Sequence, residues 1–252
     1  MQKLNNKICS YYNFSQKQNF DILFLCDHAS NKLPFYVKNL GLNNNNLLSH
    51  IAWDIGAKEV TLNLAKELNA HCLLCNFSRL LIDPNRKLIE SDLIVKISDE
   101  QQIPYNININ KKEVLHRINA YYKKYHQQIK NSVKKIYNPK KNLYIFAIHS
   151  FTKTFKKKSR YHEIGLLWNK NVALMLPMFE YFRKKKVSVG NNYPYSGYFF
   201  NFTLDNICKK KNIKSLSIEI RNDLICEAKG IKKWSMIVKE SIINTIKRNN
   251  NE

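Results

Sequence analysis

Two short apolar runs constrain this chain more than any other feature, because a histidine follows each of them. DILFLC at 21–26 and LYIFAI at 143–148 are almost entirely apolar and have the length of a strand. Such runs are typical of strands that are buried on both faces of a sheet. His28 lies two residues beyond the first run, and His149 directly follows the second. The sequence therefore predicts two buried strands with imidazoles at their carboxyl ends.

The rest of the chain alternates between strand-like and helical patterns. Further strands are predicted at 71–75, 164–168 and 215–221, and helices at 50–69, 111–137, 171–186 (interrupted at Pro177) and 230–248. Residues 87–110 are polar and aperiodic, which predicts a surface loop. This alternation predicts an α/β fold with a mostly parallel sheet. In such sheets ligands bind beyond the carboxyl ends of the strands, which is where both histidines are expected.

Length and hydropathy predict a single domain over residues 1–252, because the chain has no internal repeat and no Pro/Gly/Ser-rich linker. No segment approaches the roughly 18 to 20 apolar residues of a membrane span. The first residues, MQKLNNKICSYYNF, lack the continuous apolar run of a signal peptide. We therefore expect a cytoplasmic protein with no membrane partner.

Six cysteines, at positions 9, 26, 72, 75, 208 and 226, are expected to be buried thiols rather than disulfides. Cys72 and Cys75 have the spacing of half a zinc ribbon. Their segment reads as a strand, however, which places residues three apart on opposite faces, and no second CxxC completes a set of four ligands. We therefore expect no zinc site at this pair.

The net charge of +23 raises the alternative of a protein that binds nucleic acid or an anionic surface. Of the 42 basic residues, 35 are Lys, and they are spread along the whole chain. Because arginine forks and a clustered motif are missing, we expect no specific nucleic-acid partner. Where Lys is the default cation, each Arg indicates a position that needs a planar fork, and Arg79, Arg86 and Arg221 are the candidates. The arginines in helical patterns are expected at the surface: Arg117, Arg183 and Arg248.

The two histidines become candidate metal ligands when Asp54 is added. Asp54 lies early in the helix predicted for 50–69, beside apolar neighbours. Two His and one carboxylate with an open position form a common catalytic zinc set. His50, one helical turn earlier, competes with Asp54 for the third position. Asp27 could orient the His28 imidazole or form an ordinary turn contact, and each histidine could equally be a hydrogen-bonded core residue.

Two further segments carry polar residues in suggestive positions. In SLSIEIRND, Glu219 and Arg221 share one face of the predicted strand, so Glu219 could be a general base or the pair could form a structural salt bridge. SRLLIDPNR could be a turn braced by Arg79 and Asp83, or it could present guanidinium groups to an anionic substrate.

Eight motifs together resemble the N-formylglutamate amidohydrolase family. They are CDHASNKLP, HIAWDIGA, SRLLIDPNR, YHQQI, IHSF, IGLLW, VGNNYPYSG and SIEIRNDLI, in that order between residues 26 and 225. The family is similar in fold to the zinc-dependent exopeptidases, a three-layer α/β/α sandwich around a mixed sheet. Its named activity cleaves N-formyl-L-glutamate to glutamate and formate, in bacterial histidine degradation.

The resemblance implies roles for particular residues. It implies zinc ligation by His28 and His149. The exopeptidase pattern often places a Glu three residues after the first His, but this chain has Asn31 there, which moves the third ligand to Asp54. Glu219 resembles the exopeptidase general base. The implied contacts with the substrate come from Arg79, Arg86 and Arg221, with Asn85 and Asn222 beside them, and His126 of YHQQI is a further candidate for the catalytic site.

We therefore predict a zinc-dependent hydrolase that cleaves the amide bond of a small anionic N-acyl amino acid such as N-formyl-L-glutamate. A family member that binds its ligand without catalysis is the second alternative to this prediction, beside the basic binding protein. The oligomeric state stays open.

Overall fold

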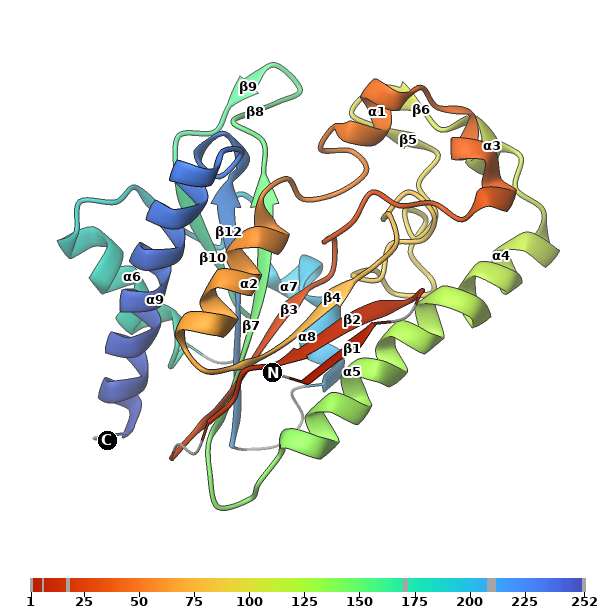
Figure 1. Cartoon of the computed structure of the whole chain (residues 1–252). Helices are drawn as coiled ribbons and strands as arrows, with labels where there is room; N and C mark the ends of the chain where they lie inside the picture. The colour runs from red at the N-terminus through yellow and green to blue at the C-terminus, as the bar shows by residue number, and fades with distance from the viewer. Residues whose placement is uncertain (1, 6, 17–18, 170–171, 208–211, 251–252) are drawn as a thin grey trace.

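A mixed eight-stranded sheet forms the centre of the chain, which we describe from a computed structural model over residues 2–5, 7–16, 19–169, 172–207 and 212–250 (Figure 1). In spatial order the strands are β1 (Gln2–Asn5), β2 (Cys9–Asn13), β4 (His71–Cys75), β3 (Asp21–Cys26), β7 (Leu143–Phe151), β12 (Ile213–Arg221), β10 (Ile164–Leu167) and β11 (Val189–Asn191). The four central strands β4, β3, β7 and β12 run parallel, while β2 and β10 pair antiparallel with their outer sides.

Helices cover both faces of this sheet. On one face lie α2 (Ala57–Glu67), α6 (Met175–Lys184) and α9 (Ala228–Asn250), and on the other lie α5 (Lys123–Ile136) and α8 (Phe202–Ile207) (Figure 1). Each face has its own apolar core, so the molecule has three layers. The prediction of an α/β/α sandwich with a mostly parallel sheet is confirmed.

The buried strands form where the apolar runs predicted them. β3 and β4 have the predicted bounds, and β7 continues past His149 to Phe151. Cys72 belongs to one core and Cys75 to the other, so the two thiols lie on opposite faces, as expected. Cys9 and Cys26 are also buried, whereas Cys226 is exposed; Cys208 lies outside the described residues.

Three helical predictions need correction. The helix predicted from 50 begins only at Ala57, after a turn that contains Asp54. The long helix predicted at 111–137 consists of α4 (Lys111–Arg117), a π-helical turn (Ile118–Tyr122) and α5. Pro177 does not interrupt α6, because it lies in the first turn, where its missing N–H has no intrahelical partner to lose.

The segment predicted as a surface loop at 87–110 is partly ordered and partly buried. It contains β5 (Ile97–Ser98), β6 (Gln101–Gln102) and α3 (Pro104–Ile107), and Leu93, Ile94 and Ile103 belong to a core. The remaining short elements are η1 (Phe35–Gly41), α1 (Asn44–Leu48), β8 (Thr154–Phe155), β9 (Lys158–Ser159), α7 (Gly197–Phe200) and η3 (Asn222–Leu224). Within the described ranges, no helix has both the length and the apolar character that crossing a bilayer requires.

Arg117 contradicts the expectation of a surface position, since it is 2% exposed. Its guanidinium donates to the side chains of Glu113 and Asn106 and to the carbonyl of Leu81. This network joins the start of the long helix to the segment that precedes Asp83.

Candidate metal centre and active site

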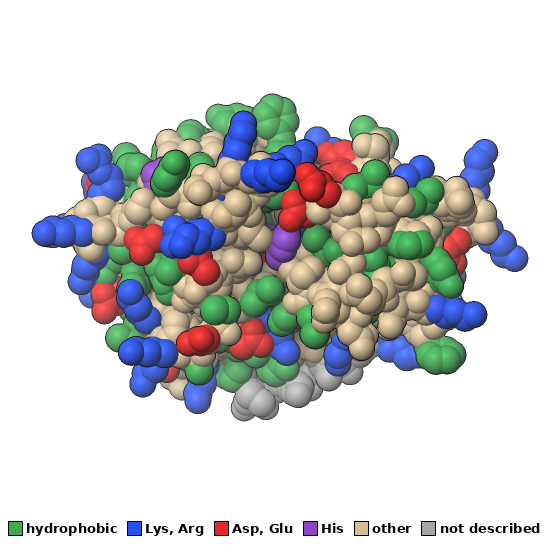
Figure 2. Space-filling model, turned by 90° about the horizontal axis from the view of Figure 1, so that it is seen from above, with side chains coloured by type: hydrophobic (Ala, Val, Ile, Leu, Met, Phe, Trp, Pro, Cys, Tyr) green, Lys and Arg blue, Asp and Glu red, His purple; other side chains and the backbone are tan. Residues whose placement is uncertain are grey.

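The carboxyl ends of three neighbouring parallel strands carry the chemically active side chains. His28 follows β3, His149 lies near the end of β7, and Glu219 lies near the end of β12. His149 and Glu219 are direct register partners in the β7–β12 ladder. Parallel strands end at the same edge of a sheet, so residues far apart in sequence meet here. In Figure 2, which looks down on this end of the molecule, a histidine is visible in a hollow, with basic and acidic side chains around it.

Asp54 reaches the same place from the turn before α2. Its backbone N–H donates to the carbonyl of His28 at 3.0 Å, and the Ser150 hydroxyl donates to the carbonyl of Ile55 at 2.9 Å. Gly56 then starts the helix at φ +79°, where an added Cβ would lie 2.1 Å from the Ile225 carbonyl oxygen. The turn is therefore fixed to the ends of β3 and β7, and only glycine fits at its exit.

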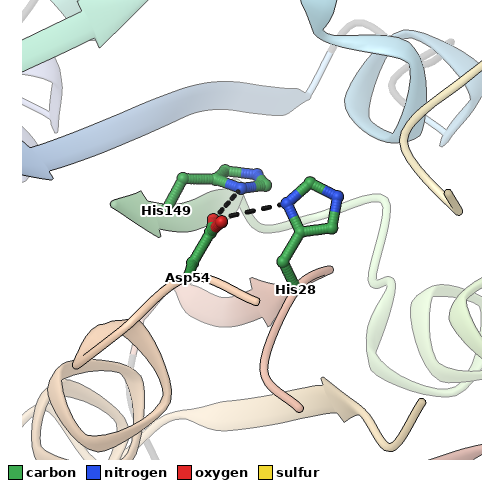
Figure 3. Close-up of side chains that lie close together, drawn as sticks. All are labelled: His28, Asp54 and His149. Carbon is green, nitrogen blue, oxygen red and sulfur yellow. Dashed lines mark hydrogen bonds and ion pairs between the residues drawn. The ribbon is translucent and has the colours of Figure 1, made fainter. Parts of the chain in front are cut away.

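His28, Asp54 and His149 converge on one point (Figure 3). Oδ2 of Asp54 lies 3.3 Å from Nδ1 of His28 and 2.9 Å from Nδ1 of His149, and one ligand atom from each residue lies within 4.8 Å of the others. All three side chains are buried. Ligands bonded at about 2.0–2.1 Å to a tetrahedral zinc are about 3.4 Å apart, so this donor set and spacing fit such an ion.

Carboxylates lie beside the outer nitrogens of both rings, but within the described residues only that of His28 is hydrogen-bonded to one. Nε2 of His28 donates to Oδ1 of Asp83 at 2.8 Å, and Arg79 donates to the other oxygen of Asp83 at 2.7 Å. Nε2 of His149 lies 3.8 Å from Oδ2 of Asp27, whose other oxygen accepts from the Tyr125 hydroxyl. The carboxylate that orients the His28 ring is therefore that of Asp83 and not that of Asp27. The feature of the sequence that could have indicated this role is the position of Asp83 between Arg79 and Pro84.

The pKa values of Asp54, His28 and His149 show that this cluster favours positive charge at the two rings. Burial disfavours an ionised Asp54, but the facing His28 and His149 rings hold the pKa of that carboxyl well below its usual range. Burial lowers the pKa of His149, yet its bond to Asp54 raises that pKa to about 9. The pKa of His28 is also raised, by Asp83 and Asp54 against burial and Arg79. Either protons on the rings or a bound cation would compensate the negative charge of the three carboxylates beside them, Asp27, Asp54 and Asp83.

The three residues line a cavity of about 340 Å³, a size suited to a small molecule. Among the other residues that line it are Arg79, Asp83, Asn85, Arg86, Thr152, Phe155, Lys156, Tyr195, Phe200 and Glu219.

Comparison with known proteins identifies the family. A model of the N-formylglutamate amidohydrolase family matches residues 20–226. The chain belongs to this family. The predicted amidohydrolase is thereby confirmed. No sequence among the curated proteins matches the chain.

Two solved structures are similar to this family member. Gene product Atu2144 from Agrobacterium tumefaciens is 27% identical over 97% of both chains, with a TM-score of 0.91. The N-formylglutamate amidohydrolase from Ralstonia eutropha JMP134 is 17% identical, over 98% of this chain and 100% of its own, with a TM-score of 0.73. At 17% identity, the similarity to the Ralstonia eutropha structure shows a shared fold.

Glu219 places a buried carboxylate beside the His–Asp–His cluster. It is 6% exposed and faces the cavity, and within the described chain its Oε2 has no hydrogen-bond partner. Burial raises the pKa of Glu219 to about 7, against the opposing effect of His149. The alternative of a salt bridge to Arg221 is wrong, because Arg221 pairs with Asp223 at 2.7 Å.

The three predicted substrate contacts from SRLLIDPNR reach the cavity, but each has a protein partner. Arg79 pairs with Asp83, so the predicted brace is present, and Arg86 pairs with Asp92 at 2.6 Å. The Asn85 amide donates to the Phe200 carbonyl and accepts from the Thr203 N–H, which anchors the segment around α7 and α8.

Three other predicted site residues do not line this cavity. Arg221 bonds to Asp223 and to backbone carbonyls, and Asn222 begins η3 and accepts from the Ile225 N–H. His126 is buried beneath the site, where its Nε2 donates to the Pro84 carbonyl at 2.9 Å. His126 thus supports the turn after Asp83.

The structure also distinguishes between the two candidates for the third ligand, His50 and Asp54. His50 lies at the rim of the cavity, where its Nε2 lies 3.1 Å from Oδ2 of Asp99. Asn31, in the exopeptidase glutamate position, donates to the Leu47 carbonyl instead. Asp54 is the carboxylate that meets both histidines.

Proposed function

We propose that this enzyme hydrolyses the amide bond of an anionic N-formyl or other N-acyl amino acid, such as N-formyl-L-glutamate, with zinc held by His28, Asp54 and His149. The observation that supports this most directly is the buried His–Asp–His cluster beside the free carboxylate oxygen of Glu219, in a cavity of small-molecule size. We further propose that residues 1–252 act as one domain, in the cytoplasm.

When bound, zinc would act as a Lewis acid on the amide carbonyl and lower the pKa of a water that it ligates. Glu219 takes a proton from the attacking water at Oε2 and returns it to the leaving nitrogen. Its raised pKa of about 7 suits both steps, because the group can accept and release a proton near neutral pH. Arg79, whose Nη1 lies 3.8 Å from Asp54, holds Asp83 in the position from which it accepts from His28.

The test is turnover by purified protein with and without metal. We expect release of formate from N-formyl-L-glutamate by the zinc-loaded protein, loss of activity after chelation and dialysis, and recovery on adding zinc. Turnover of a panel of N-formyl and N-acetyl derivatives of Glu, Asp, Met and Leu identifies which acyl group and which amino-acid side chain the enzyme accepts. No turnover of any panel member by the metal-replete wild type, with Glu219→Gln as the blank, would refute the proposal.

A further inference from the structure

The cationic side chains around the cavity differ in whether they are already neutralised. Arg79 pairs with Asp83 and lies near Asp54, and Arg86 pairs with Asp92. An arginine that is already paired must give up or share its carboxylate before it can bind another. The residue that recognises an anionic substrate is therefore better sought among cations without an acidic partner.

Arg160 is such a cation. Its guanidinium stacks on the ring of Phe155, with 4.7 Å to the centroid, and on that of Tyr195, with 5.0 Å. It donates to the Tyr195 hydroxyl at 3.0 Å and, more weakly, to the hydroxyl and carbonyl of Thr152. Over the described ranges of the chain, it forms no ion pair with a carboxylate. Arg160 does not itself line the cavity, but Phe155, Tyr195 and Thr152 all do, so its unpaired positive charge lies directly against residues of the cavity wall.

Tyr195 connects this charge with the reacting groups. Burial raises the pKa of the Tyr195 hydroxyl, Glu219 raises it further, and Arg160 opposes them. The hydroxyl accepts the hydrogen bond from Arg160, and Tyr195 lines the same cavity as Glu219. A substrate whose amide lies at Glu219 can place a carboxylate toward Arg160 across the width of a small cavity.

Arg221 holds the backbone that carries Arg160. Its Nη1 donates to the carbonyls of Arg160 and Tyr161 at 3.4 and 3.3 Å, while Asp223 neutralises its charge. The N–H of Arg160 donates to the Lys153 carbonyl at 2.8 Å and closes the β8–β9 hairpin, which stands beyond the carboxyl end of β7 (Figure 1). The arginine predicted to bind substrate thus supports a different arginine that the sequence did not single out.

We propose that Arg160 is the specificity-determining residue of this enzyme, which binds a carboxylate of the substrate away from the scissile amide, and that Arg221 positions it. This rests on the proposed function. Guanidinium and carboxylate pair through two parallel hydrogen bonds, and the aromatic rings on Arg160 fix the plane of its fork. Lys156, on the same hairpin, is exposed and lines the cavity, but its ammonium lacks the planar fork that pairs with a carboxylate through two parallel bonds.

The experiment compares three substrates: N-formyl-L-glutamate, its α-amide and its γ-amide. For Arg160→Gln we expect kcat/KM on the dicarboxylate to fall about 10- to 100-fold, mainly through KM, with little change on the amide that lacks the bound carboxylate. Arg160→Lys should recover part of the loss. Arg221→Gln and Tyr195→Phe should show smaller losses with the same substrate dependence. Arg183→Gln, on the exposed side of α6, is the matched control and should change nothing.

The outcomes separate the two proposals. A wild type that turns over no member of the N-formyl and N-acetyl panel overturns the proposed function and this inference with it. A wild type that turns over another panel member is tested with that compound and its α-amide in place of the three. An active wild type whose Arg160→Gln variant loses activity equally on all three substrates, or on none, overturns the inference alone. If Arg160→Gln does not fold, the substrate dependence of Arg221→Gln and Tyr195→Phe decides in the same way.

Discussion

Asp83 accepts a hydrogen bond from the outer nitrogen of His28 at 2.8 Å, so the inner nitrogen of that ring faces Asp54. A neutral imidazole held in this way turns its lone pair toward the centre of the cluster. Carboxylates in this position orient a metal-binding histidine and raise its basicity. The hydrogen bond from His28 to Asp83 should therefore affect how tightly the site binds zinc.

Asp83→Asn should weaken zinc binding by about 10- to 100-fold while leaving the three ligands in place. The amide can still contact the ring, but it removes the negative charge and one acceptor of the Arg79 bond. Competition with a chromogenic chelator measures the affinity. Asp92→Asn in the same segment is the matched control, since Asp92 pairs with Arg86 and does not contact the ring. Equal affinities in wild type and Asp83→Asn would contradict the role given to Asp83.

Removal of a ligand should have a larger effect. We expect about one zinc per chain in the metal-replete wild type, and a small fraction of that in His149→Ala and Asp54→Asn, measured by mass spectrometry after gel filtration. Zinc should also raise the melting temperature of the wild type but not of these variants. His116→Gln, on the exposed side of α4, should retain the full metal content. Full zinc occupancy in Asp54→Asn would exclude Asp54 as a ligand.

Glu219→Gln should lower kcat by about 100- to 10,000-fold and leave zinc content unchanged, because the residue moves a proton and does not hold the metal. For the wild type, the active form is the carboxylate, so activity falls as the pH drops through the pKa of Glu219. That pKa is about 7 without a metal, and a bound cation favours the carboxylate, so the acid limb of kcat/KM should have its midpoint at or below about pH 7. An acid limb centred well above pH 7, or an active Glu219→Gln, would contradict the assignment.

Arg117→Met should destabilise the fold rather than alter the chemistry. The substitution leaves the Leu81 carbonyl and the Asn106 side chain without a buried donor, which costs about 2–4 kcal/mol. Urea unfolding followed by circular dichroism measures the change. Arg183→Met is the comparison, and the same loss of stability in both variants would mean that the buried network contributes nothing.

The cysteines should differ sharply in reactivity. Burial raises the pKa of Cys9 to about 11 and that of Cys72 to about 12, so neither thiol ionises near neutral pH, whereas Cys226 is exposed. Iodoacetamide at pH 7.5 should label Cys226 well before Cys9 and Cys72, as read from peptide mass spectra at increasing times. Urea should abolish the difference, and fast labelling of Cys72 in the folded protein would contradict its burial.

The sequence predicted best where local pattern and tertiary environment agree. Continuous apolar runs marked β3 and β7, and the polar residues that end those runs marked His28 and His149. The edge strands β1 and β11 and the strand β2 beside β1 were missed; CSYYN of β2 and VGN of β11 have neither alternation nor a long apolar run. Asp54 was placed on a helix because Ile51 and Ile55 fit the apolar face predicted for 50–69, although the helix begins only after Gly56.

The residue with which a side chain pairs was harder to predict than the place of that side chain in the fold. Alternation along β12 placed Glu219 and Arg221 on one face, but it could not show that Asp223 would pair with Arg221. Arg160 follows a run of lysines, so nothing in its local sequence distinguishes it from a solvated cation. Its stacking on Tyr195 joins residues 35 positions apart and exists only in the folded chain.

The direct pairing of His149 with Glu219 in the β7–β12 ladder has a wider consequence. The separation between the proposed metal ligand and the proposed base is set by the spacing of adjacent strands, about 4.8 Å, and not by a loop. No insertion or deletion in the surrounding segments can change it without breaking the sheet. The β8–β9 hairpin and the segments at 85–100 and 192–200 are free of that constraint. Relatives could therefore exchange one substrate for another by replacing these segments alone, with the hydrolytic step inherited unchanged.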